Sequence, residues 1–244
     1  YQRVKDVLVS SVEFVDFSAE ADPEARYAEW LNGRKTRLIT LDEQLFDTAL
    51  IKLGENDYLW YLCKHHLITD GVAFALVYKN MAAFYALAVA GKLDEAPELP
   101  QYQEFAAYEE AYRQSDEYAE AARYWLDKVN TAASPTEFYG RTLQNASGRT
   151  DRIPFELTAE QSNKLREIAM KDGFASLSVD MSLFTVFATL LLSTVHRING
   201  QTQLRLGTPF HARPSAAFKE TIGLFIEIGP LQVSIDEDET FVSL

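Results

Sequence analysis

Two adjacent histidines followed by a carboxylate form the most chemically suggestive group in the sequence. His65 and His66 are adjacent, Asp70 comes four residues after His66, and Gly71 follows directly. An imidazole can accept or donate a proton near neutral pH. An apolar run over 58–63 precedes the pair and good helix formers follow it, which predicts a loop between a strand and a helix N-terminus. Because catalytic groups are often carried on loops held by rigid elements, this pattern predicts a proton-transfer site.

The same residues also fit a structural role, and the residue types alone leave both possibilities open. Asp70 fits as a helix N-cap with Gly71 easing the turn, and the histidines fit as hydrogen-bonded core groups. A metal site is a weaker alternative, because two histidines and one aspartate fall short of a usual ligand set. No Gly-rich phosphate loop or G-x-S-x-G elbow occurs, and Cys63 is the single cysteine, so nucleotide, serine-hydrolase and dithiol chemistry have no motif support.

The elements that must position this loop alternate between strands and helices. Asn32-Gly33 is expected to end the first helix, and the strand before the histidines is expected to be buried on both faces. A Ser-, Thr-, Asn- and Gly-rich stretch then breaks the periodicity. We therefore predict an α/β fold with an N-terminal lobe over 1–130, a linker over 131–150 and a C-terminal lobe over 151–244. Strands are predicted over 7–17, 45–53, 58–64, 153–157, 203–207 and 225–233, and helices over 22–31, 72–89, 102–112, 116–129, from 158, and over 179–198.

Composition narrows the class of protein. The 244 residues include 36 Asp and Glu against 23 Lys and Arg, a net charge of -13, which argues against nucleic-acid binding because that needs clustered cations. The apolar helices over 72–89 and 179–198 are not expected to cross a membrane, since Lys79 and Asn80 interrupt the first and the second has an uncharged stretch shorter than roughly 20 residues. With one cysteine and no signal-peptide pattern, we expect a cytoplasmic protein.

The two ends of the sequence lead to a further expectation. The chain begins at Tyr1 and runs at once toward a strand-like segment, and an acidic cluster over 236–239 precedes a last apolar run. Acidic residues before an apolar run are typical of a helix start. We therefore expect this sequence to be a piece of a longer polypeptide.

The segment from His65 to Gly71 resembles the HHxxxDG motif of nonribosomal peptide synthetase condensation domains, which belong to the chloramphenicol acetyltransferase-like superfamily. Other HHxxxDG acyltransferases share this motif, so the order of further matches along the chain carries the resemblance. These matches are Tyr102, Phe105 and Ala106, then Tyr124-Trp125, Leu206 to Pro209, Ala212 to Pro214, and Ile222 to Ile226. The resemblance implies two chloramphenicol acetyltransferase-like sandwich lobes, each only partly covered by this chain, with the active site at their junction.

The resemblance also implies an activity and its partners. In the family, the amine of a carrier-bound acceptor attacks a carrier-bound donor acyl or peptidyl thioester and forms an amide bond. Donor and acceptor peptidyl carrier proteins and an adjacent adenylation domain are the implied partners, with neither nucleic acid nor membrane. No cofactor or metal is implied on the domain itself, because the phosphopantetheine arms of the carrier proteins deliver the substrates.

By the family pattern, His66 is the catalytic residue, as a general base or as a hydrogen-bond anchor for the attacking amine. Asp70 is expected to form a partly buried, bidentate ion pair with Arg213 that ties the catalytic loop to the second lobe. His65 is expected to hold the loop by a hydrogen bond. Gly71 is expected to allow a close backbone approach at the tunnel wall.

Three other functions stay open beside condensation. The first is an HHxxxDG acyltransferase that uses acyl-CoA or a lipid donor, and the second is an epimerisation domain, which needs a further glutamate. The third is a non-catalytic domain that only recruits partners. In addition, Glu227-Ile228 stands where the family usually has Asn-Thr, which points to a divergent subtype such as a starter domain.

Overall fold

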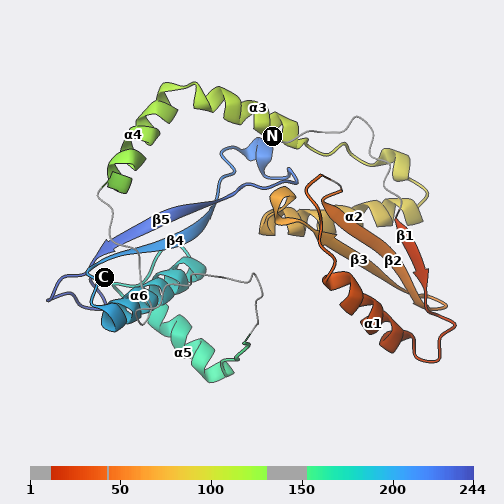
Figure 1. Cartoon of the computed structure of the whole chain (residues 1–244), viewed down its shortest axis with the longest axis horizontal. Helices are drawn as coiled ribbons and strands as arrows, with labels where there is room; N and C mark the ends of the chain where they lie inside the picture. The colour runs from red at the N-terminus through yellow and green to blue at the C-terminus, as the bar shows by residue number, and fades with distance from the viewer. Residues whose placement is uncertain (1–11, 43, 131–152) are drawn as a thin grey trace. The chain divides into compact units, whose positions relative to one another are not determined.

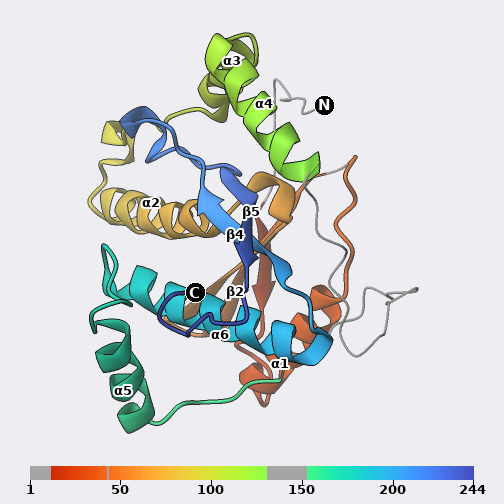
Figure 2. The ribbon, with the colours of Figure 1, turned by 90° about the vertical axis from the view of Figure 1, so that its left-hand side faces the viewer.

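The computed structural model describes residues 12–42, 44–130 and 153–244 (Figures 1 and 2). The chain divides into two compact units, one made of Tyr1–Glu110 with Ala212–Ile226 and the other of Ala111–His211 with Glu227–Leu244. The predicted linker over 131–150 lies outside the described residues. The lobes over 1–130 and 151–244 therefore stay predictions.

The first unit contains a three-stranded sheet in the order β1 (Glu13–Asp16), β2 (Phe46–Gly54) and β3 (Asp57–Lys64). β1 runs parallel to β2, and β2 pairs antiparallel with β3. The short turn after Gly54 joins β2 to β3, as the Gly-Glu-Asn-Asp sequence between the two apolar runs predicted. The hairpin therefore delivers the chain directly from β3 to the histidine pair.

Two helices cover opposite faces of this sheet. Successive side chains of a strand point to opposite faces, so Trp60 and Tyr61 of β3 mark the two sides. Tyr61 packs edge-on against Trp30 of α1 (Pro23–Lys35) at 5.1 Å between ring centroids, whereas Trp60 lies 5.5 Å from Tyr78 of α2 (Gly71–Val89). The hairpin thus lies between α1 and α2, with a core of Phe17, Ala49 and Ile51.

Two expectations for this unit are wrong. The first helix does not end at Asn32-Gly33 but continues to Lys35, because Arg34 packs back onto the sheet. Its guanidinium donates to the Asp47 carboxylate at 2.6 Å and lies 5.1 Å from the ring centroid of Trp30. The second wrong expectation is that β3 is buried on both faces. Its first residues are exposed and the rest are half-buried.

The second unit is built around one long apolar helix. That helix, α6 (Val179–Asn199), packs against the antiparallel ribbon of β4 (Gln203–His211) and β5 (Ile226–Ser234), with Leu192, Val195, Leu204 and Ile235 in the core. Thr158 and Gln161 form the predicted capping box of α5 (Ala159–Ala169), which packs on α6. The strand expected over 153–157 is wrong, because these residues have no regular structure. The two other helices are α3 (Tyr102–Arg113) and α4 (Asp116–Asn130).

Among the described residues, α2 and α6 are long and apolar enough to cross a membrane by length and composition alone. The core helix of a globular domain passes the same test. The expectation that neither helix crosses a membrane stays a prediction.

Candidate active site

The loop that carries the two histidines is a short, hydrogen-bonded connection. β3 ends at Lys64, a single 3-10 turn covers His66–Ile68, and α2 begins directly after Asp70. The half-buried His65 accepts the Leu67 backbone N–H on Nδ1 at 3.1 Å, which is the kind of bond expected of a residue that holds the loop. His66 is exposed. Its imidazole is therefore accessible to a substrate, while its neighbour is engaged with the backbone.

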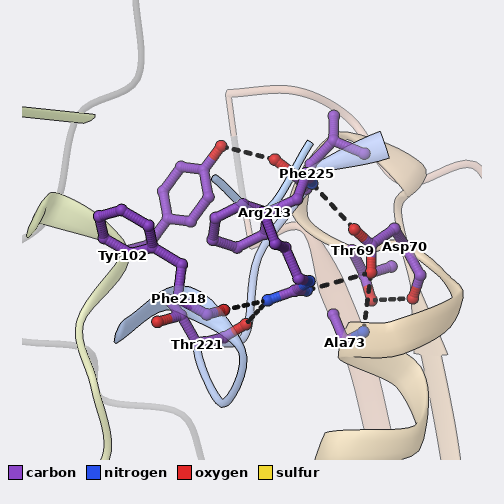
Figure 3. Close-up of polar contacts among 9 residues, drawn as sticks. Thr69, Asp70, Ala73, Tyr102, Arg213, Phe218, Thr221 and Phe225 are labelled. Carbon is purple, nitrogen blue, oxygen red and sulfur yellow. Dashed lines mark hydrogen bonds and ion pairs between the residues drawn. The ribbon is translucent and has the colours of Figure 1, made fainter. Parts of the chain in front are cut away.

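The Asp70 side chain is completely buried and saturated with donors (Figure 3). Oδ1 accepts the Ala73 backbone N–H at 2.7 Å, which caps α2, and Oδ2 accepts the Phe225 backbone N–H at 2.9 Å. Burial raises the pKa of this carboxyl, but the Ala73 and Phe225 amides and the charge of Arg213 outweigh it, so its pKa lies below the ordinary value. Asp70 is therefore a fixed anion at the end of the histidine loop.

Arg213 meets Asp70 as predicted, but the geometry of the pair corrects the prediction in one respect. The contact is a single one, Nη2 to Oδ1 at 3.4 Å, rather than a bidentate one. The Asp70 side chain is buried and Arg213 is half-buried, in keeping with the partly buried pair that was expected. The other guanidinium nitrogen, Nη1, donates to the carbonyls of Phe218 at 2.6 Å and Thr221 at 2.8 Å. Nη1 thus holds the loop of Arg213 itself, Phe225 occupies the second oxygen of Asp70, and Nε has no hydrogen-bond partner among the described residues, so the pair is not bidentate.

The segment Ala212–Ile226 belongs to the same compact unit as the histidine loop. Besides the bond to Asp70, it contacts α2 through an exposed ion pair between Lys79 and Glu220 at 2.7 Å. Asp70 and Arg213 are 143 residues apart in sequence, yet both lie within this one unit.

An aromatic cluster supports this segment from the other side. Phe105 of α3 is buried and packs against Phe225 at 4.4 Å and Phe218 at 5.3 Å between ring centroids. The Phe225 ring in turn lies 3.9 Å from the Arg213 guanidinium carbon, a cation–π contact. Tyr102 completes the cluster. The motif matches had singled out Tyr102 and Phe105, but local sequence gives no signal for their contact with a segment more than 100 residues away.

Gly71 begins α2 and has open space at its side-chain position. A Cβ atom built there meets no described atom within 4 Å, and the close approach expected at the tunnel wall stays a prediction. No described group of three or more His, Cys, Asp or Glu side chains is placed to hold a metal ion.

Lys64, which ends β3 directly before the histidines, has an unusual environment that the sequence did not signal. Its Nζ is buried and has no hydrogen-bond partner among the described residues, and it lies 4.7 Å from the centroid of the Phe74 ring. Burial lowers the pKa of this amine. The loop of His65 and His66 is therefore bounded by a buried cation on one side and a buried anion on the other.

Comparison with known proteins identifies the class. The family model described as Condensation domain matches residues 1–244, so this chain belongs to the condensation-domain family. The chain is 27% identical over 239 residues to cyclosporin synthetase from Tolypocladium inflatum, covering 96% of this chain and 2% of that protein. It is 23% identical over 231 residues to a dimodular nonribosomal peptide synthase from Bacillus subtilis (strain 168), covering 94% of this chain and 9% of that protein.

Solved structures agree with this assignment. The first condensation domain of the CDA synthetase is similar with a TM-score of 0.70 and 25% identity, over 95% of this chain and 50% of that one. An epimerization domain from tyrocidine synthetase B has a TM-score of 0.71 at 20% identity, over 93% of this chain and 52% of that one, which shows the fold alone. The chain is therefore a condensation domain of the nonribosomal peptide synthetase family with an α/β fold, and it spans about half the length of these solved structures.

Proposed function

We propose that this chain is the part of a condensation domain that carries its catalytic histidine, and that the whole domain forms an amide bond between two carrier-bound substrates. The observation that carries the proposal is the pairing of an exposed His66 with a completely buried, saturated Asp70 four residues later. A side chain that must reach a substrate needs exposure, whereas the loop that aims it needs a rigid anchor.

In the proposed reaction, the acceptor amine nitrogen attacks the carbonyl carbon of the donor thioester. The C–N bond forms, the C–S bond breaks, the sulfur leaves as a thiol on the donor carrier arm, and one amine proton is lost. His66 accepts or anchors that proton, and protonation of the leaving sulfur balances the step. A positioned acid or base raises the rate by roughly 10² to 10⁴, which corresponds to about 3 to 5.5 kcal/mol. Orientation of two tethered reactants contributes about 7 to 11 kcal/mol, so positioning is the larger effect.

The proposal extends to architecture and partners. We assign residues 1–130 and 151–244 to the two sandwich lobes of the chloramphenicol acetyltransferase-like fold, each partly covered by this chain. Donor and acceptor carrier proteins bring their substrates on phosphopantetheine arms, an adenylation domain loads them, and the domain works in the cytoplasm. Glu227 is exposed at the start of β5, where the family usually has asparagine, and we assign it to substrate choice rather than to the chemistry.

The test uses the full-length protein with purified donor and acceptor carrier proteins that bear loaded phosphopantetheine arms. Mass spectrometry of the acceptor arm is expected to find the donor acyl group joined through an amide. An acceptor arm that acquires the acyl group only from free acyl-CoA would identify the acyltransferase instead. Inversion at the α-carbon without bond formation would identify an epimerisation domain, and unchanged carriers that still bind would identify a recruitment domain.

A further inference from the structure

The structure points to a positioning role for Tyr102 and Gly223, which we infer together set the geometry of the His66 loop. Tyr102 lies at the start of α3, and Gly223 lies in the segment Ala212–Ile226 beside Arg213. The inference rests on the proposed role of His66, and it adds two residues that act through the anchor of its loop.

The first observation is the close approach of the Tyr102 ring to the backbone of Gly223. A Cβ atom built at Gly223 would lie 2.1 Å from Cδ2 and 2.4 Å from Cε2 of that ring, distances that Cβ contacts do not reach. Gly223 itself is buried. Position 223 therefore requires glycine as long as the Tyr102 ring occupies its present place.

The second observation is a hydrogen bond that fixes the same stretch of backbone. The Tyr102 hydroxyl donates to the Leu224 carbonyl at 2.8 Å, one residue after Gly223 (Figure 3). The ring also meets Phe225 edge-on at 5.3 Å between centroids. The ring packing and the hydrogen bond together fix the position of residues 223–225 relative to α3.

The third observation connects this backbone to the histidine loop. The Phe225 N–H belongs to the same peptide group as the Leu224 carbonyl, and it donates to Asp70 Oδ2 at 2.9 Å inside the buried cluster. Asp70 ends the loop that begins at His65, and its other oxygen caps α2. A shift of residues 223–225 would therefore pull or release Asp70 and change where His66 points.

A displacement of this kind reduces turnover without weakening binding, because it misplaces the reacting group and leaves the carrier-binding surfaces alone. Misplacement by about 1 Å can cost on the order of 100-fold in rate. Gly223→Ala forces the ring and the backbone apart, whereas Tyr102→Phe removes only the hydroxyl. Tyr102→Ala removes the ring, which makes room for a methyl group at position 223.

The experiment measures amide formation by the full-length protein carrying these substitutions. Gly223→Ala is expected to lower kcat by about 10- to 100-fold with KM for the acceptor carrier unchanged. Tyr102→Phe is expected to lower kcat by about 2- to 10-fold, the range of one hydrogen bond. In the Tyr102→Ala background, adding Gly223→Ala is expected to change kcat by less than about twofold, because the clash is gone.

A second readout needs no activity. The rate of carbethoxylation of His66 by diethyl pyrocarbonate, mapped by mass spectrometry, is expected to change in Gly223→Ala and Tyr102→Phe. His196, half-buried near the end of α6 in the other unit, is the control and is expected to keep its rate.

The outcomes separate this inference from the proposed function. A Gly223→Ala variant with the kcat and the His66 carbethoxylation rate of the wild type would overturn the inference. So would an equal loss of kcat on adding Gly223→Ala with and without the Tyr102 ring. If the wild-type protein forms no amide while His66 reactivity still follows the Tyr102–Gly223 contact, the positioning role stands and the proposed function fails.

Discussion

The two ends of the histidine loop bury opposite charges in opposite ways. Asp70, after the loop, receives hydrogen bonds from two backbone amides and Arg213. Lys64, before the loop, has a buried ammonium that lies beside the Phe74 ring and has no hydrogen-bond partner among the described residues. A buried charge stabilises a fold only when its bonds repay its desolvation. The comparison therefore predicts that the loop is anchored through Asp70 and strained at Lys64.

Asp70→Ala is expected to have the largest effect. It leaves Arg213 buried without its anion and removes the cap of α2, which together cost about 3 to 5 kcal/mol. The measurement is the local free energy of opening of α2, from amide hydrogen exchange of the full-length protein. Asp22→Ala is the matched control, because Asp22 caps α1 through Ala25 in the same way but is exposed, so its loss is expected to cost only about 1 kcal/mol. Equal costs at both positions would contradict the role of the buried cluster.

Lys64→Met is expected to act in the opposite direction and more weakly. It keeps the volume against Phe74 and removes an ammonium that has no hydrogen-bond partner in the described part of the chain, so the free energy of opening of the hairpin and α2 is expected to rise by about 1 kcal/mol. The control is Lys164→Met on the exposed surface of α5, which is expected to change it by less than about 0.5 kcal/mol. A loss of stability in Lys64→Met comparable to that in Asp70→Ala would show that the Lys64 ammonium makes stabilising bonds, and it would contradict the difference drawn between the two buried charges.

The smallest effect is a pH dependence. Because the folded-state pKa of Asp70 lies below its ordinary value, the ionised carboxylate contributes stability that is present above about pH 4 and lost as the pH falls through the folded-state pKa. The stability difference between wild type and Asp70→Asn, measured by hydrogen exchange, is therefore expected to be constant near neutral pH and to shrink below about pH 4. A difference that stays constant down to about pH 2 would contradict a folded-state pKa of Asp70 below its ordinary value, because stability depends on pH only where the folded and unfolded pKa values differ.

Local sequence predicted the elements whose causes are local. The β2–β3 hairpin and the Thr158 capping box were predicted, and the Asp70 cap of α2 was one of the roles left open for that residue, because turn residues and caps act within a few positions. The expected end of α1 at Asn32-Gly33 was wrong, because the contacts of Arg34 with Asp47 and Trp30 outweigh a weak helix former.

The candidate site was only partly predictable, for a related reason. Resemblance to the family brought Asp70 and Arg213 together across 143 residues, but it did not predict that Phe225 would take the second carboxylate oxygen. That bond depends on how the backbone of 223–225 is held, which in turn depends on the Tyr102 ring. The buried Lys64 amine gave no signal, since a lysine at the end of a strand is usually solvated.

The most direct test of the central claim is single-turnover amide formation by the full-length protein with His66→Ala. Removal of a positioned acid–base group is expected to slow the reaction by roughly 10² to 10⁴. Because His66 is exposed, hydrogen exchange of α2 is expected to match that of the wild type. Amide formation at the wild-type rate in a protein with unchanged hydrogen exchange would contradict the assignment of His66 as the catalytic residue.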